Sequence, residues 1–311
     1  MKEGNLNNSS EQPLVSIVVI TYNSSKYVLE TLESAKAQSY QNIELIISDD
    51  CSKDDTIEVC QHWLKNNENC FIKAKLIQTP KNTGIASNVN RGVKEAKGEW
   101  IKLIAGDDML LPNCIKDYVH YVTYNNSDFV FGLPSIISED KVSGHNEKWE
   151  KKYLDNDWFF ALEAKQQFLY LLIRNFPVNP PTLFFKKDTL VQLKYCDEEY
   201  LCEDLPLYLK ATFNGYKLDL LKSKTVIYRM HNNSSSLNLT NWHVYIGKIV
   251  NKYLSWALIK SHPFFVWEAY NLNLYYKVNL FFNNNYFIKR LLIILRLCSP
   301  IFLLKKLNYV K

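Results

Sequence analysis

Two adjacent carboxylates, Asp107 and Asp108, follow an apolar run that extends from Ile101 to Ala105 and ends in a glycine. Like charges at contact distance repel, and a buried carboxylate costs free energy unless a positive group lies beside it. Either a solvated turn or a bound divalent cation would relieve this repulsion. Mg²⁺ prefers oxygen ligands and takes few of them from the protein, so one or two carboxylates suffice. The pair is therefore a candidate metal site.

The elements that must position this pair alternate along the first half of the chain. Strands are predicted over residues 14–22, 43–50, 75–79 and 99–106. Helices are predicted to about Gln38, from a capping box at 52–55 to about Asn66, and over 84–98, with Gly98 closing the last. Continuous apolar strands that alternate with helices indicate an α/β fold, in which a mostly parallel sheet has helices on both faces.

Polar clusters end two more of these strands. The clusters are Thr21-Tyr22-Asn23 and Asp49-Asp50. Ligands bind at the carboxyl ends of the strands in such sheets. We therefore expect both clusters to lie at one edge of the sheet, together with Asp107 and Asp108.

The second half of the chain is less regular. Helices are predicted over 112–125, 158–174, 202–218 and 240–311, of which 158–174 is apolar. Strands are predicted over 128–133 and 179–187, and a third strand runs from 224 into a loop that ends at 236. A polar loop is predicted over 138–157. The prolines of 179–187 predict a place at the edge of the sheet, because proline cannot donate to a ladder. A glycine is expected to end the helix over 202–218.

Composition narrows the class of protein. The chain has 311 residues, enough for one large domain or two modest ones, and its hydrophobic and charged fractions are ordinary for a globular protein. The seven cysteines are scattered and form no CxxC pair, which favours reduced thiols in a cytosolic protein over disulfides or a zinc site. Residues 1–12 are polar, so we expect a disordered N-terminus and no signal peptide.

The positive charge belongs to the C-terminal tail. No acidic residue follows Glu268, whereas seven lysines and arginines do, so residues 1–268 carry about −2 of the overall +5. This balance disfavours nucleic acid as a partner of the main domain and points to an anionic surface as the partner of the tail.

The tail contains an apolar run over 291–304, which Arg296 and Pro300 interrupt. This run is shorter than the roughly 20 residues that a membrane-spanning helix needs. Basic residues flank it without acids, so residues 286–306 are predicted to form an amphipathic helix at a membrane surface. The alternative is a terminal helix that packs on the domain or on a second copy.

Two segments resemble family 2 glycosyltransferases. They are VSIVVITYNSSKYVLETLESAKAQSYQNIELIISDDCSKDDT and NTGIASNVNRGVKEAKGEWIKLIAGDDMLLP, and a looser resemblance extends over residues 180–236. The resemblance implies the GT-A fold, a single Rossmann-like nucleotide-binding domain, over 13–238, followed by a helical extension over 239–311. It also implies inverting transfer of a sugar from a nucleoside diphosphate sugar, with Mg²⁺ or Mn²⁺ as cofactor.

The resemblance assigns metal binding to Asp107 and Asp108, and Asp107 is also assigned to the nucleotide-sugar site. The family often has a further aspartate two residues earlier, where this chain has Ala105. The metal would then depend on the pair, with Asp108 favoured as the direct ligand. Arg229 and His231 resemble an element that closes over the diphosphate, with His231 as a metal ligand and Arg229 on phosphate oxygens. The alternative is a surface strand end.

The resemblance also assigns residues to the nucleotide. Asp49 or Asp50 would accept the imide N–H of uracil or a ribose hydroxyl, although both acids also suit a helix cap. The remaining assigned residues are Thr21, Tyr22 and Asn23, which would pack the base, and Asn82, Gly84 and Asn90, which match the family's NxG…N piece. Arg91 is left open between phosphate and solvent.

Asp204 is the candidate general base. Inverting transfer needs one carboxylate to deprotonate the acceptor hydroxyl, and Glu203-Asp204 before an apolar helix matches the family's acidic pair. Pro206 departs from the family pattern, but proline is tolerated in a first helical turn. The alternative is that both acids only complement the helix dipole.

We therefore interpret the chain as a glycosyltransferase of bacterial surface-polysaccharide synthesis, using a UDP-sugar and a lipid-linked saccharide acceptor. It is expected in the cytoplasm, peripherally bound to the inner face of the plasma membrane. Two alternatives remain. A sugar-1-phosphate nucleotidyltransferase would need a Gly-rich basic loop after the first strand, which is absent. A non-catalytic GT-A-like scaffold is supported only by Ala105.

Overall fold

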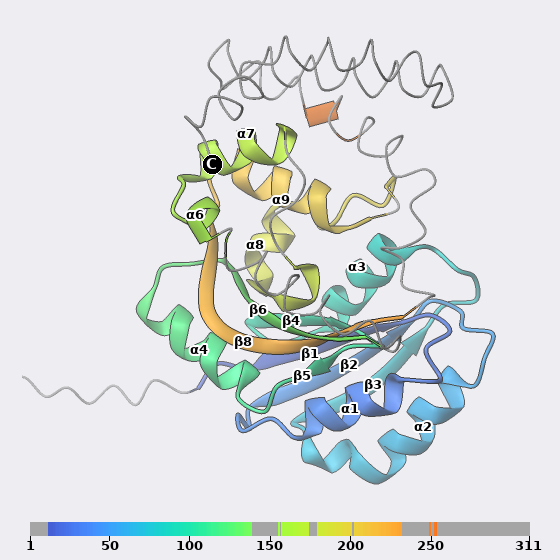
Figure 1. Cartoon of the computed structure of the whole chain (residues 1–311). Helices are drawn as coiled ribbons and strands as arrows, with labels where there is room; N and C mark the ends of the chain where they lie inside the picture. Colours follow the sequence, from blue (N-terminus) through green and yellow to red (C-terminus); the bar gives the residue numbers. More distant parts are fainter. Residues whose placement is uncertain are drawn as a thin grey trace, which may run out of the picture.

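The apolar runs of the first half form four parallel strands at one end of an eight-stranded sheet (Figure 1). The computed structural model describes residues 12–138, 155, 157–173, 179–200 and 202–231, together with residues 249, 252 and 253. The strand order is β3-β2-β1-β4-β7-β6-β8-β5. The strands are β1 (Val15–Thr21), β2 (Ile43–Asp49), β3 (Lys73–Gln78), β4 (Trp100–Ala105), β5 (Met109–Leu110), β6 (Phe129–Ser138), β7 (Leu183–Lys186) and β8 (Leu218–Met230).

Helices cover both faces of the sheet, as the alternation predicted. The helices are α1 (Val28–Lys36), α2 (Thr56–Asn67), α3 (Ile85–Glu95), α4 (Cys114–Tyr124), α6 (Asp157–Phe160), α7 (Ala164–Ile173), α8 (Lys187–Gln192) and α9 (Asp204–Phe213), with short 3₁₀ turns η1 (Glu68–Cys70) and η2 (Pro180–Thr182). Ile17 and Val19 of β1 pack with α1, α2 and α4. Val18 points to the other face and belongs to a cluster with α3, α7 and α9.

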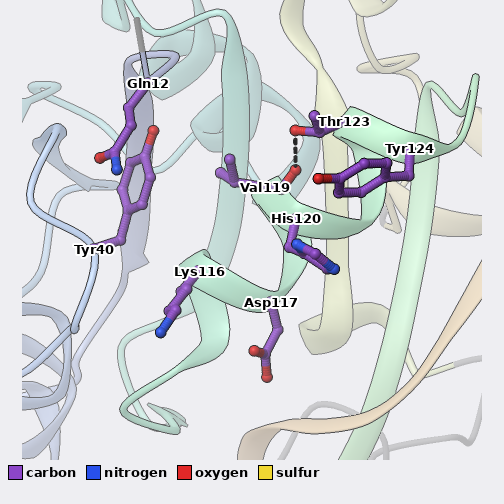
Figure 2. Close-up of a pocket in the computed structure, with 8 residues that line it drawn as sticks. All are labelled: Gln12, Tyr40, Lys116, Asp117, Val119, His120, Thr123 and Tyr124. Carbon is purple, nitrogen blue, oxygen red and sulfur yellow. Dashed lines mark hydrogen bonds between the residues drawn. The ribbon is translucent and has the colours of Figure 1, made fainter. Parts of the chain in front are cut away.

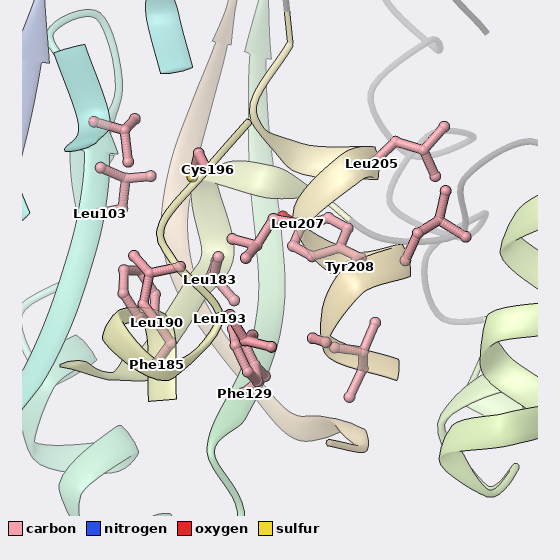
Figure 3. Close-up of a cluster of buried hydrophobic side chains, with 14 of the residues drawn as sticks. Leu103, Phe129, Leu183, Phe185, Leu190, Leu193, Cys196, Leu205, Leu207 and Tyr208 are labelled. Atoms are coloured by element: carbon pink, nitrogen blue, oxygen red, sulfur yellow. The ribbon is translucent and has the colours of Figure 1, made fainter. Parts of the chain in front are cut away.

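The second of these clusters joins the two halves of the chain. Figure 3 shows Leu103 of β4 together with Phe185 of β7 and with Leu207 and Tyr208 of α9. All four side chains are buried. This shared core fixes α9, which begins at Asp204, relative to the parallel strands that carry the other candidate residues.

The prediction that residues 179–187 form an edge strand is wrong. The strand is β7, which lies inside the sheet between β4 and β6 and is antiparallel to both. The prolines precede it in η2, so they remove no ladder hydrogen bond, and Phe184 is fully buried. The sheet is therefore mixed, although its first four strands are parallel as predicted.

Helix boundaries differ from the predictions at three places. The helix expected to end at Gly98 ends at Glu95, and a Cβ at Gly98 would lie 2.5 Å from the backbone nitrogen of Ser16. Gly98 is thus required for close approach of two segments. The single helix predicted over 158–174 is two helices, α6 and α7, and α8 was not predicted. The glycine expected to end the helix over 202–218 is confirmed as Gly215, whose φ is +93°.

Several predictions fall on residues that are not described. They are the disorder of 1–11, most of the loop over 138–157, and the extension over 239–311 apart from residues 249, 252 and 253, which are helical. The basic tail lies outside the described residues as a whole. Among the residues that are described, no helix is both long and apolar enough to cross a bilayer.

Candidate active site

The carboxyl ends of three neighbouring strands meet at one edge of the sheet, as predicted. In the parallel register Thr21 of β1 lies beside Asp49 of β2, and Ile20 lies beside Ala105 of β4. The polar residues that follow these strands are therefore close in space. Beyond β4 the chain turns at Gly106, whose N–H donates to the Ile20 carbonyl, and reaches Asp107 and Asp108.

Asp49 is fully buried, and its carboxylate is bonded within the protein. It accepts hydrogen bonds from Thr21 Oγ1 at 2.8 Å, Ser52 N at 2.8 Å and Ser52 Oγ at 2.5 Å. These bonds fasten the turn after β2 to the end of β1. A nucleobase N–H would have to share an oxygen with these donors, so the role predicted for Asp49 in base binding stays a prediction.

Asp50 holds the start of α3. Its carboxylate accepts from Thr83 N at 2.9 Å, Thr83 Oγ1 at 2.6 Å, Gly84 N at 2.7 Å and Arg91 Nη2 at 3.0 Å. Burial raises the pKa of Asp50, but the hydrogen bonds from Thr83, Arg91 and Gly84 outweigh burial and hold the pKa below its usual value. Arg91, which the sequence left open, thus faces an internal carboxylate.

Tyr22 and Asn23 lie in the loop that follows β1. Asn23 adopts a φ of +52°, its N–H donates to Ser52 Oγ, and its Oδ1 accepts from Lys53 N. The loops after β1 and β2 are therefore tied together. Tyr22 is 48% exposed, which leaves its ring accessible at this edge. Its predicted contact with the base remains a prediction.

Asn82, Gly84 and Asn90 have three different environments. Gly84 has a φ of +89°, a conformation that favours glycine, and it precedes the first residue of α3. Asn82 is exposed and accepts from Gly84 N at 3.1 Å. Asn90 is buried, and its amide bonds both backbone groups of Cys196 and the carboxylate of Glu198. Its amide thus joins α3 to the segment before α9.

The end of β8 closes over the acidic pair. Arg229 N donates to Asp108 Oδ1 at 2.9 Å, and Arg229 Nε donates to the Asp107 carbonyl at 3.0 Å. His231 Nε2 lies 3.0 Å from Asp107 Oδ2. Asp108 is 1% exposed, and burial, followed by the charge of Asp107, raises its pKa well above the usual value. The structure therefore brings together all four residues predicted for metal and diphosphate.

Two atoms of this cluster fit a divalent cation. Neighbouring ligands of an octahedral cation with bonds of 2.0–2.1 Å lie about 3 Å apart. Asp107 Oδ2 and His231 Nε2 have this separation, 3.0 Å, which is also the length of the hydrogen bond between them. Within the described parts of the chain, no three His, Cys, Asp or Glu side chains are grouped to hold a metal. The fit is therefore a partial set that needs substrate oxygens to complete it.

A buried lysine, Lys102, lies near the acidic pair and was not predicted from the sequence. Lys102 of β4 is fully buried, and its Nζ donates to the carbonyls of Leu103, Pro181 and Leu183. Burial lowers its pKa to about 8, while Cys114 and Asp108 oppose this shift. The signal in the sequence was a single cation inside an otherwise apolar strand. Lys102 attaches η2 to β4 beside the acidic pair.

Asp204 begins α9, and its Oδ1 accepts from Leu205 N at 2.6 Å. Loss of hydration raises the pKa of Asp204. Burial also raises the pKa of Glu203, and the negative charge of Asp204 raises it further. The two acids thus form a closely spaced pair in which burial favours the protonated form of each carboxyl group. Asp204 lies in the first turn of α9, where a carboxylate complements the helix dipole, and its role as general base stays a prediction.

The hollow shown in Figure 2 lies away from these residues. Its volume is about 460 Å³, and it is lined by Gln12, Tyr40, Lys116, Asp117, Val119, His120, Thr123 and Tyr124. Tyr40 donates to the Pro13 carbonyl, just before β1 begins, so the hollow lies at the amino end of that strand. It is not the candidate active site.

Comparison with known proteins identifies relatives along most of the chain. The model of the family described as Glycosyl transferase family 2 matches residues 16–187. Glycosyltransferase GlyG of Streptococcus pneumoniae is 34% identical over 119 residues, which are 38% of this chain and 38% of GlyG. The minor teichoic acid biosynthesis protein GgaB of Bacillus subtilis is 24% identical over 237 residues, 73% of this chain and 25% of GgaB. The chain spans less than half the length of these two relatives.

Solved structures with the same fold include two sugar-nucleotide complexes. Staphylococcus aureus TarS 1-349 in complex with UDP-GlcNAc has a TM-score of 0.60 at 19% identity, covering 83% of this chain and 72% of that one. The mannosyltransferase PcManGT of Pyrobaculum calidifontis in complex with GDP-Man and Mn²⁺ has a TM-score of 0.59 at 15% identity, covering 85% and 74%. The predicted GT-A fold is confirmed.

Replacing Asp50 with Asn tests the tie between β2 and α3. Asn has one acceptor oxygen and no charge, so we expect a loss of about 1–3 kcal/mol in unfolding free energy at pH 7. The pKa of Asp50 is lower in the folded than in the unfolded chain, so its contribution is full above about pH 4 and is lost as the pH falls through the folded-state value. Urea unfolding at pH 7, 5 and 3 should show a gap between the proteins that narrows toward pH 3. A gap of constant size would contradict this.

Proposed function

The chain belongs to glycosyl transferase family 2, and from this premise we propose that it transfers a sugar, with inversion and with a divalent cation, from a nucleoside diphosphate sugar to a saccharide acceptor. The observation that carries the proposal is the convergence of Asp107, Asp108, Arg229 and His231 at the carboxyl edge of the sheet. Carboxylates, a guanidinium and an imidazole in contact suit a diphosphate with its cation.

The donor is proposed to be a UDP-sugar bound by Mn²⁺ or Mg²⁺. Two structures with the same fold support this proposal: TarS holds UDP-GlcNAc, and PcManGT holds GDP-Man with Mn²⁺. The base would lie against the loops that carry Thr21, Tyr22, Asn23, Asp49 and Asp50. Because the carboxylates of Asp49 and Asp50 accept several internal hydrogen bonds, we place more of the base contact on Tyr22 and on backbone groups.

The cation would be held by Asp108, Asp107 and His231. When bound, it would neutralise the charge that develops on the departing nucleoside diphosphate. Arg229 contributes a positive charge at the same place, since its side chain is 9% exposed and its Nε donates to the Asp107 carbonyl. Gly84 and the start of α3, which are bonded to Asp50, would lie on the nucleotide side.

Asp204 would take the proton of the acceptor hydroxyl as that oxygen attacks the anomeric carbon. Its raised pKa makes it a stronger base than an ordinary aspartate. The hydroxyl oxygen then forms the new glycosidic bond, and the bond to the diphosphate breaks on the opposite face of the sugar.

The acceptor is proposed to be a lipid-linked saccharide of bacterial surface-polysaccharide synthesis, used at the inner face of the plasma membrane. The name of GgaB, a teichoic acid biosynthesis protein, supports the polysaccharide class. The basic sequence over 286–306 supports attraction to anionic lipid. Family membership disfavours the nucleotidyltransferase alternative, and the intact acidic pairs disfavour a non-catalytic scaffold.

A donor panel with an Asp108→Ala variant tests the reaction and its metal. Purified protein is offered UDP-, GDP- and dTDP-sugars with Mn²⁺, with Mg²⁺ or with chelator, and release of the nucleoside diphosphate is followed. We expect turnover of a UDP-sugar only with the cation, and a loss of about 100-fold or more in Asp108→Ala, with its circular dichroism unchanged. If the protein neither turns over nor binds any of these donors, the enzyme proposal is wrong.

An Asp204→Asn variant tests the general base. Asn cannot take a proton, so kcat should fall about 10²- to 10⁴-fold while the dissociation constant of the donor stays within about twofold. In the wild type, kcat/KM should rise with pH to a midpoint above the ordinary aspartate value of about 4. Glu203→Gln is the matched control and should retain most of its activity. Equal losses in both variants would assign the pair to structure.

Deleting residues 285–311 tests the tail. If this segment binds anionic lipid, the truncated protein should lose sedimentation with vesicles of phosphatidylglycerol while its turnover of a soluble donor is kept. Vesicles of phosphatidylcholine alone should bind neither protein. Unchanged sedimentation of the truncated protein would move the membrane role elsewhere or remove it.

A further inference from the structure

One face of α1 carries polar side chains that form hydrogen bonds with residues around the acidic pair. Residues three or four apart on a helix share a face. The members are Tyr27, Glu30, Thr31, Ser34 and Gln38, of which Tyr27 and Gln38 flank the helix ends. We call this set the α1 stripe. It was not among the residues assigned from the sequence.

Thr31 holds the backbone of Asp108. Its Oγ1 donates to the Asp108 carbonyl at 2.7 Å, and its side chain is buried. One turn later, Ser34 Oγ accepts from Leu110 N at 2.9 Å. The stripe therefore holds the main chain directly after the two carboxylates.

Gln38 extends this grip along the same loop. Its Nε2 donates to the Leu111 carbonyl at 2.9 Å, and its Oε1 accepts from Ile115 N at 3.1 Å. The segment from Asp108 to the first turn of α4 is thus attached to α1 at each end. These hydrogen bonds restrict the backbone of the loop.

Glu30 holds the carboxylate of Asp108 indirectly, through Arg229. Glu30 Oε2 accepts from Arg229 Nη2 at 2.6 Å, and the guanidinium carbon lies 4.6 Å from the centre of the Tyr27 ring. Arg229 in turn donates its backbone N–H to Asp108 Oδ1 and its Nε–H to the Asp107 carbonyl. Asp108 is therefore held at its carbonyl from α1 and at its carboxylate from β8, and Glu30 of α1 holds the side chain of the β8 residue that makes the second bond.

This arrangement matters because two adjacent carboxylates repel each other until a cation arrives. A metal site binds well when its ligands are held in place before binding and their orientation is set by neighbours that do not touch the metal. The guanidinium of Arg229 lies beside the pair, yet it would move outward if no anion were bonded to its Nη2. Glu30 is that anion.

We propose that Thr31 and Glu30 are positioning residues, which hold Asp107 and Asp108 in the arrangement that binds a divalent cation. Neither touches the cation or the substrate. The proposal rests on the proposed function, because it takes the acidic pair as a cation site. It adds that the affinity of this site for metal is set by α1, a helix with no ligand of its own.

Thr31→Val removes the hydroxyl and keeps the shape, and Thr31→Ser keeps the hydroxyl. Thr212→Val is the matched control, because Thr212 is as buried as Thr31, at 1%, and donates only within its own helix. The readout is Mn²⁺ binding in the presence of UDP, followed by the electron paramagnetic resonance of free Mn²⁺, with thermal unfolding alongside. We expect the dissociation constant of Mn²⁺ to rise about fivefold in Thr31→Val and to stay near the wild-type value in Thr31→Ser and Thr212→Val.

Glu30→Ala and Glu33→Ala form the second matched pair. Both glutamates lie on α1 with about half of the side chain exposed, at 52% and 50%, but Glu33 contacts Trp63 and Lys36 instead of Arg229. We expect weaker Mn²⁺ binding, by about three- to tenfold, only in Glu30→Ala.

Two outcomes overturn the positioning role. One is unchanged Mn²⁺ affinity in Thr31→Val and Glu30→Ala, and the other is an equal loss in the control variants. Both leave the proposed function intact as long as the wild-type protein binds Mn²⁺ and UDP. If the wild-type protein binds neither, the proposed function fails first and the positioning role fails with it, so the two failures are told apart before any variant is compared.

Discussion

The contact on which this edge of the molecule depends is the hydrogen bond from the backbone N–H of Arg229 to the buried carboxylate of Asp108. A carboxylate with 1% of its surface exposed, next to a second carboxylate, must be compensated from within the protein. Compensation comes from two directions, since Arg229 lies on β8 and Lys102 lies on β4. The path of the chain in the second half brings one of these groups into place.

The strands β5 and β8 bring the second half of the chain to the acidic pair. After the acidic pair, Met109 and Leu110 pair antiparallel with Ile227 and Val226. Because β8 continues past this pairing to Met230, its last residues lie beside the pair, and Arg229 and His231 reach Asp107 and Asp108 from the same side. The pairing of β5 with β8 is only two residues long, yet it sets the distance between the two halves of the candidate site.

The first half of the fold could be predicted because each parallel strand is a continuous apolar run that ends in polar residues, and buried parallel strands have this pattern. The same pattern placed Asp49, Asp50, Asp107 and Asp108 at one edge. The second half could not be predicted in this way. A run such as Leu183–Lys186 has no feature that distinguishes a central antiparallel strand from an edge strand, and only the tertiary partners of Phe184 decide it. Contacts such as Asn90 with Cys196, 106 residues apart, follow from that packing and have no local signal.

The chain has Ala105 at the position where its family resemblance led us to expect another carboxylate. The charges around the acidic pair show what a carboxylate at this position would add. A third aspartate would add a further negative charge to a pair that burial already disfavours. The imidazole of His231 lies 3.0 Å from Asp107 and offers a nitrogen lone pair without a negative charge when neutral. The cluster then holds two carboxylates against one guanidinium, and the His231 ring lies tilted against Tyr27 with ring centres 5.1 Å apart, while Tyr27 also faces that guanidinium. A site with fewer anions depends more on how firmly each is held, and this is why the hydrogen bonds of α1 and β8 to the acidic pair matter for any cation that binds there.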